Sequence, residues 1–101
     1  MVYKDYTIIN GHFFFDPDDL IYNDHFPGNP IVPGSLIIQA FIDALSKNGF
    51  NQSSLIIKNF KFKQFVVPGK YNYKIYESAN KIICKLFNQN SIEMVGGVFL
   101  L

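Results

Sequence analysis

Residues 24–48 read DHFPGNPIVPGSLIIQAFIDALSKN and decide the fold. Three prolines fix the backbone φ angle and remove N–H donors in the first half, so residues 23–34 are predicted to form a stiff, irregular loop. Residues 35–48 form the one convincing helix, because Gly34 and Ser35 are start signals and Asn48-Gly49 is a stop signal.

Apolar residues occupy nearly every angular position of that helix. A helix that is apolar all round is normally buried on all sides. In a chain of 101 residues, only a sheet wrapped around a single helix can bury it in this way.

The remaining sequence supplies such a sheet. The strands are predicted at residues 6–15, 55–67, 71–76, 81–87 and 92–101, with turns at Asp16–Asp19, Pro68-Gly69, Glu77–Asn80 and Asn88–Ser91. Gly11, inside the first strand, indicates a bulge or a close approach. A strand, one helix and then a meander of strands indicate an α+β protein with an antiparallel sheet, forming one domain over residues 1–101.

Composition excludes several classes of function. The net charge is +1, which gives no electrostatic reason to expect a nucleic acid as partner. All nine cations are lysines, and the five between Lys58 and Lys74 form either a solvated strand face or a docking patch for an acidic partner. The single Cys84 excludes an internal disulfide and a cysteine-based zinc site. No run resembles a signal peptide or a membrane span, so we expect a cytoplasmic protein with no membrane partner.

The segment from His25 to Ala40, HFPGNPIVPGSLIIQA, resembles the signature of the hot-dog-fold 3-hydroxyacyl-acyl-carrier-protein dehydratases. The family run is His-Phe-Pro-Gly-x-Pro-x-x-Pro-Gly-x-Leu followed by an acidic residue and Ala, and only the acid is replaced, by Gln39. A second stretch, FKFKQFVVPGK at residues 60–70, is similar to the family's Phe-Lys-x-x-Val-x-Pro-Gly-Asp strand and turn.

The resemblance implies a curved antiparallel sheet around one long central helix. It also implies a dimer, often assembled into hexamers, with active sites at the dimer interface. The substrate would be an acyl thioester on the phosphopantetheine arm of an acyl carrier protein, in fatty-acid or polyketide-like biosynthesis. No metal or organic cofactor is expected.

The resemblance assigns roles to individual positions. His25 matches the base that removes the proton alpha to the thioester carbonyl, and the Gly34 N–H matches the donor to the enolate oxygen. Gln39 stands where a carboxylic acid would protonate the leaving hydroxyl, and an amide cannot transfer that proton. Asp43, one turn further along the helix, is a possible compensating acid. His12 lacks such a context and is assigned a structural role.

Several apolar residues are candidates for contact with the acyl chain, and each is alternatively a core residue. They are Phe26, Ile31, Pro33, Phe62 and Val66, with Phe60 and Phe65 as further tunnel candidates.

Three functions follow from these residues. The leading one is dehydration of 3-hydroxyacyl thioesters to trans-2-enoyl thioesters, with reduced activity because of Gln39. The alternative is a catalytically impaired subunit that binds acyl carrier proteins or pairs with an acid-bearing homologue in a heterodimer. A weaker alternative is an acyl thioesterase, for which Asp43 is the available carboxylate.

Overall fold

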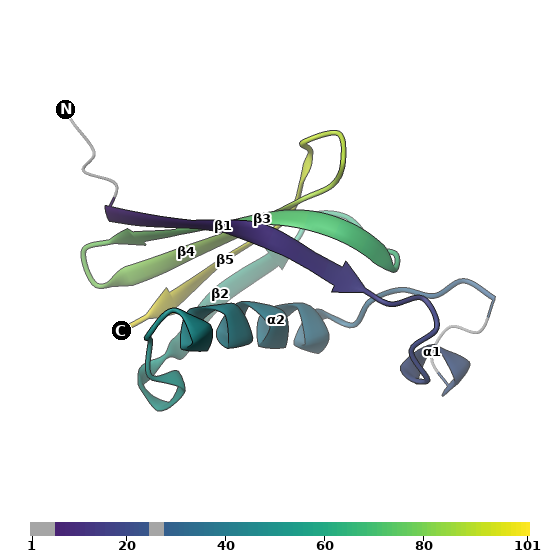
Figure 1. The fold of residues 1–101 in the computed structure, drawn as a ribbon, viewed down its shortest axis with the longest axis horizontal. Helices are drawn as coiled ribbons and strands as arrows, with labels where there is room; N and C mark the ends of the chain where they lie inside the picture. Colours follow the sequence, from purple (N-terminus) through teal and green to yellow (C-terminus); the bar gives the residue numbers. More distant parts are fainter. Residues whose placement is uncertain (1–5, 25–27) are drawn as a thin grey trace.

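The computed structural model describes residues 6–24 and 28–101, and these form one antiparallel sheet with a helix against its concave face (Figure 1). The strands are ordered β1-β3-β4-β5-β2 across the sheet. In chain order the elements are β1 (Tyr6–Phe15), α1 (Ile21–Asp24), α2 (Gly34–Lys47), the 3-10 helix η1 (Gln52–Ser54), β2 (Ile56–Phe62), β3 (Gly69–Ser78), β4 (Lys81–Phe87) and β5 (Glu93–Leu100).

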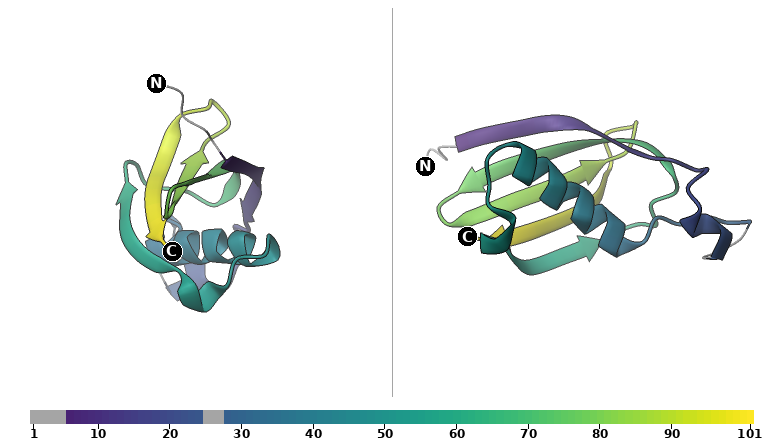
Figure 2. Two further views of the ribbon diagram at one scale, coloured as in Figure 1. Left: turned by 90° about the vertical axis from the view of Figure 1, so that its left-hand side faces the viewer. Right: turned by 60° about the horizontal axis from the view of Figure 1, so that its bottom comes forward.

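The sheet curves around α2, which lies along its concave side (Figure 2). The helix turns Ile37, Phe41, Ala44 and Leu45 into the core, at the three- and four-residue spacing of one helical face. Phe41 is fully buried and contacts the rings of Phe13 and Tyr73 edge to face, at 5.1 and 6.0 Å between ring centroids. The predicted α+β class and the curved sheet around one helix are therefore confirmed.

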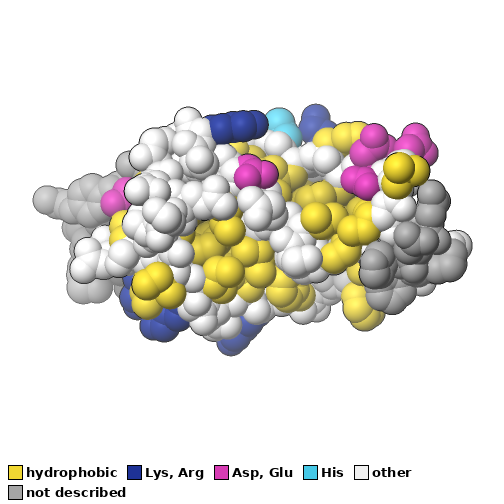
Figure 3. All heavy atoms as spheres, turned by 90° about the horizontal axis from the view of Figure 1, so that it is seen from below, with side chains coloured by type: hydrophobic (Ala, Val, Ile, Leu, Met, Phe, Trp, Pro, Cys, Tyr) yellow, Lys and Arg dark blue, Asp and Glu magenta, His cyan; other side chains and the backbone are white. Residues whose placement is uncertain are grey.

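The prediction that α2 is buried on all sides is wrong for this chain. Gln39 and Asp43 are exposed, while Leu36, Ile38 and Ile42 are only half-buried. The reason is geometric: a single five-stranded sheet covers one side and both flanks of a helix, and leaves the fourth side open. Seen from that side, hydrophobic side chains lie at the surface between polar ones (Figure 3).

Several element boundaries differ from prediction, and β3 is longer than predicted because Gly69, Glu77 and Ser78 belong to it instead of to turns. Residues 23 and 24 belong to α1, because the Asp19 carboxylate and carbonyl accept from the N–H groups of Ile21 and Tyr22 and start a turn before the prolines act. The strand predicted over residues 55–67 ends at Phe62. Beyond it, the Lys63 N–H still donates to the Met94 carbonyl, and the chain then leaves the sheet.

Gly11 in β1 makes room for a ring instead of forming a bulge. It pairs with Tyr73 of β3, and a Cβ added at Gly11 would lie 2.5 Å from the Tyr73 hydroxyl oxygen. Tyr73 stacks on Phe13 with a centroid separation of 4.2 Å. Of the two alternatives that the sequence left open, the close approach is the one the structure contains.

The outer face of the sheet carries an ion cluster. Glu93 contacts Lys63 Nζ and lies 3.3 Å from Lys85 Nζ. Hydrogen bonding to Lys63, with Lys85 adding to it, holds the pKa of the Glu93 carboxyl below its usual value. The five lysines between Lys58 and Lys74 are all exposed, which both a solvated strand face and a docking patch require.

Neighbouring glycines in β5 provide a test of the packing. A Cβ at Gly97 would overlap the ring of Phe60, which packs on Phe41 and Phe99. We expect Gly97→Ala to lower the free energy of unfolding by about 1–3 kcal/mol, because the ring has to move inside a filled core. Chemical denaturation measures this change.

Gly96→Ala is the matched control, because a Cβ there meets only the Glu93 carboxylate, 3.1 Å away at the end of a flexible side chain. We expect this variant to unfold close to the wild-type midpoint. Equal destabilisation of the two variants would contradict the packing of Phe60 over Gly97.

Candidate active site

The N-terminus of α2 is held by the proline-rich loop. Pro33 is the N-cap, with φ −59° and ψ 142°, and its carbonyl accepts from the N–H groups of Leu36 and Ile37 at 3.0 and 3.3 Å. Gly34 is the first helical residue. The first N–H groups of a helix lack intrahelical acceptors and lie at the positive end of its dipole, so this end favours negative charge.

Phe62 packs directly on Gly34. A Cβ at Gly34 would lie 2.8 Å from Phe62 Cζ, so the ring needs a glycine at this position. Phe62 is the last residue of β2 and remains 45% exposed. The backbone N–H of Gly34, at the start of α2, is thus a donor beside the aromatic ring of Phe62. Sequence reasoning did not find this contact, because it joins two elements that are far apart in the chain and leaves no local signal.

A backbone hydrogen bond ties the loop to the segment after β2. The Val32 N–H donates to the Val66 carbonyl at 2.7 Å, and both side chains are buried. Ile31 and Pro33, on either side of Val32, are half-buried. Val66 lies in the core, so any contact with an acyl chain stays a prediction. His25 and Phe26 lie outside the described residues.

Gln39 and Asp43 form a pair on the exposed side of α2. Gln39 Nε2 donates to Asp43 Oδ1 at 2.9 Å, as the four-residue spacing allows. A helix advances about 100° per residue, so Gln39 lies about 140° around α2 from Gly34. One chain therefore does not direct both residues into the same cavity.

A groove of about 250 Å³ runs between α2 and the β1 edge of the sheet. Its walls carry a carboxylate, an ammonium, an imidazole and a phenol. The lining residues are His12, Phe13, Ala40, Asp43, Ala44, Lys47 and Tyr73. The groove was not predicted from the sequence. Ala40 and Ala44, one helical turn apart, were a signal for it, because two small side chains on one face let a helix approach a neighbouring strand.

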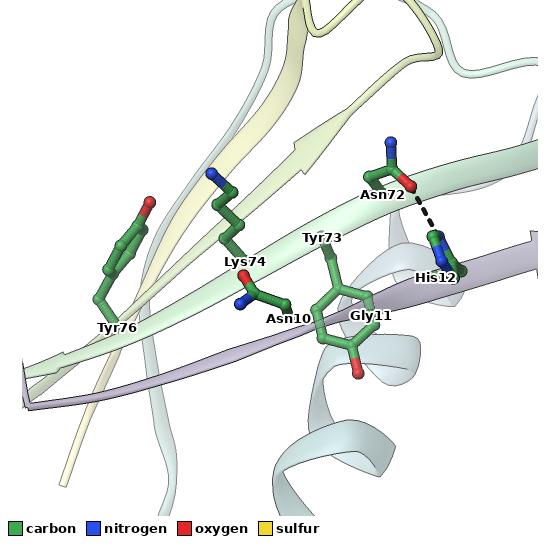
Figure 4. Close-up of a pocket in the computed structure, with 7 residues that line it drawn as sticks. All are labelled: Asn10, Gly11, His12, Asn72, Tyr73, Lys74 and Tyr76. Carbon is green, nitrogen blue, oxygen red and sulfur yellow. Dashed lines mark hydrogen bonds between the residues drawn. The ribbon is translucent and has the colours of Figure 1, made fainter.

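A second hollow, of about 490 Å³, lies over β1 and β3 (Figure 4). His12 Nδ1 and Asn72 Oδ1 are hydrogen-bonded at 2.6 Å across these strands. The structural role assigned to His12 stays a prediction. None of the predicted catalytic or substrate-binding residues lines this hollow. Its residues are Asn10, Gly11, His12, Asn72, Tyr73, Lys74 and Tyr76.

Over residues 6–24 and 28–101, no group of three or more His, Cys, Asp or Glu side chains is arranged to hold a metal ion. In the same part of the chain, no helix is long and apolar enough to span a membrane.

Burial raises the pKa of the Cys84 thiol to about 12.

Comparisons with known proteins agree with the sequence resemblance. The chain is similar to the 3-hydroxyacyl-acyl-carrier-protein dehydratase FabZ of Clostridium acetobutylicum, with 37% identity over 60 residues, covering 52% of this chain and 43% of that protein. It is 34% identical to FabZ of Lactococcus lactis over 73 residues, covering 61% of this chain and 48% of that protein. It is 38% identical to FabZ of Fusobacterium nucleatum over 72 residues, covering 65% of this chain and 51% of that protein.

The chain thus spans about half the length of these curated relatives or less. A family match extends further along the chain: the ApeI-like family, described as the ApeI dehydratase, matches residues 2–94. Together with the sheet wrapped around α2, this match shows that the chain belongs to the ApeI-like dehydratase family.

Proposed function

We propose that the protein dehydrates 3-hydroxyacyl thioesters, carried on an acyl carrier protein, to trans-2-enoyl thioesters in fatty-acid or polyketide-like biosynthesis. The observation that carries the proposal is Gly34 at the first position of α2, with its backbone close to the Phe62 ring and held by the Pro33 cap. Family membership and the names of the curated relatives support the same chemistry.

The reaction starts when the imidazole of His25 removes the proton alpha to the thioester carbonyl. The C–H electron pair moves toward the carbonyl oxygen, and the Gly34 N–H stabilises the negative charge that develops there. Return of that electron pair forms the double bond and breaks the bond between C3 and the hydroxyl oxygen. The hydroxyl takes up a proton, either from the His25 imidazolium formed in the first step or from Asp43 as the candidate acid, and leaves as water. In the second case the proton on His25 passes to solvent and Asp43 regains one from it. Neither a metal nor an organic cofactor takes part in the proposed steps.

Gln39 makes this reaction slow. Its amide can hold the 3-hydroxyl by hydrogen bonds but supplies no proton, and general acid catalysis contributes about 10²–10⁴-fold. Asp43, bonded to Gln39, is the candidate compensating acid. Under that hypothesis, Asp43→Asn abolishes turnover.

We propose that the complete site needs two chains. Gly34 and Gln39 lie on different sides of α2, and Gln39 is exposed, so the Gln39 of one chain meets the Gly34 of another. The half-buried Ile38 and Ile42 lie close to Gln39 along the helix and supply apolar surface for such an interface. The pairing forms a homodimer, a heterodimer or a higher oligomer, and light scattering of the purified protein distinguishes these by mass.

The test is dehydration of a 3-hydroxyacyl thioester followed through the absorbance of the enoyl product. We expect measurable turnover that is faster with the thioester on acyl carrier protein than on free pantetheine. No enoyl product above the uncatalysed background with either substrate would overturn the proposal.

The replacement of the acid by Gln39 favours one second function. A subunit that keeps the loop and Gly34 but lacks the acid forms one complete site when it pairs with an acid-bearing homologue. If the protein is such a helper, we expect a mixture of this chain and the acid-bearing homologue to dehydrate the substrate much faster than the sum of the two separate rates. An active homodimer with no gain on mixing would contradict it.

A further inference from the structure

Gln39 has a hydrogen-bonding side chain with two different ends. The Nε2 group donates, and Oε1 accepts. A free glutamine can present either end to a ligand by a half-turn of the amide. Which end faces the substrate therefore depends on the neighbours of Gln39.

Asp43 removes this freedom. An ionised carboxylate can only accept hydrogen bonds, so it selects the donor end of the amide. The 2.9 Å hydrogen bond from Gln39 Nε2 to Asp43 Oδ1 accordingly leaves Oε1 as the end of the amide that is available to a ligand. Because donation to a charged acceptor is stronger than donation to a neutral one, this orientation is favoured over its reverse.

We propose that Asp43 is a positioning residue that, by orienting Gln39, makes the site select 3-hydroxyacyl thioesters over 3-oxoacyl thioesters. This inference rests on the proposed function. A 3-hydroxyl donates its proton to the fixed Oε1 acceptor. A 3-oxo group has only lone pairs to place there, so two acceptors face each other without a proton between them.

The family's carboxylic acid does not impose this choice, because a protonated carboxyl both donates and accepts. With Gln39 in place of the acid, and its amide oriented by Asp43, the side chain no longer supplies a proton. In exchange, it distinguishes a 3-hydroxyl from a 3-oxo group. Such recognition is useful where 3-oxoacyl thioesters, the oxidised form of the substrate, are present in the same compartment.

The test measures binding, so it does not depend on turnover. Pantetheine amides replace the reactive thioester, in matched 3-hydroxyacyl and 3-oxoacyl forms, and calorimetry gives the dissociation constant of each. We expect the wild type to bind the 3-hydroxyacyl amide at least about tenfold more tightly than the 3-oxoacyl amide. A difference of this size is expected because the first ligand forms a hydrogen bond that the second cannot form.

Asp43→Asn is the decisive variant. Asparagine keeps the size of the side chain and a hydrogen bond to Gln39, but it pairs equally with either end of the amide. We expect the preference to fall below about threefold. Asp43→Glu keeps an acceptor-only group and is expected to retain the preference. Glu77→Gln on β3 makes the same charge change away from the pair and controls for net charge.

An unchanged preference in Asp43→Asn would overturn the inference, as would equal binding of the two ligands by the wild type. These results are distinguishable from failure of the proposed function, which is read separately as absence of enoyl product from the wild type. If neither amide binds to the wild type, the inference is overturned, whatever the outcome of the turnover assay. Loss of turnover in Asp43→Asn with the binding preference intact would identify Asp43 as the acid and overturn the positioning role.

Discussion

We expect the replacement of Gln39 by Glu to raise the rate of the proposed 3-hydroxyacyl thioester dehydration by about 10²–10⁴-fold, the range that general acid catalysis contributes. The helix already places this side chain on its exposed side, so the change adds a transferable proton without altering the backbone. The measurement is kcat with a saturating carrier-bound substrate.

Gln39→Met is the matched control, because it keeps an unbranched side chain of similar length but offers neither a proton nor an amide. We expect its rate to be at or below that of the wild type. A Gln39→Glu enzyme no faster than the wild type would show that position 39 does not hold the missing acid.

We expect the replacement of Gly34 by Pro to lower kcat for the proposed dehydration by about 10²–10³-fold, the cost of removing one donor to an oxyanion. Proline lacks the N–H that the mechanism needs and is otherwise suited to the first helical position. The preceding residue also tolerates it, because Pro33 already has φ −59° and ψ 142°, in the region that a following proline requires.

Gly34→Ala distinguishes the loss of the N–H donor from the effect of a Cβ against the Phe62 ring. Alanine and proline both place a Cβ against the Phe62 ring, but alanine keeps the N–H. We expect both variants to disturb Phe62 to a similar extent in thermal unfolding, while Gly34→Ala retains most of the wild-type kcat. Equal loss of kcat in the two variants would assign the effect to the displaced ring and not to the N–H.

The boundaries of α2 could be predicted because their causes are local. The Gly34-Ser35 and Asn48-Gly49 pairs place its ends to within a residue, and the spacing of Gln39 and Asp43 gives their contact directly. The end of β2 could not be predicted in the same way. Apolar residues continue past Phe62 in the sequence, but the Val66 carbonyl bonds to Val32, a partner that only the folded loop brings close.

The surroundings of the site depend on distant contacts for the same reason. The sequence identified Gly34 and Phe62 separately, but nothing local showed that the ring of one lies against the backbone of the other. The exposed side of α2 was missed because apolar content alone does not tell whether the same chain or a second one covers a helix. The partial exposure of Ile38 and Ile42, which shows that this chain's own sheet does not cover them, is known only from the folded structure.

The mass of the acyl carrier protein after reaction tests the central claim most directly. The purified wild-type protein is incubated with a 3-hydroxyacyl carrier protein, and intact-mass spectrometry follows the carrier. We expect a carrier that has lost one water and still holds its acyl chain. A carrier returned with a free thiol would identify a thioesterase, and an unchanged carrier would contradict dehydration by this chain.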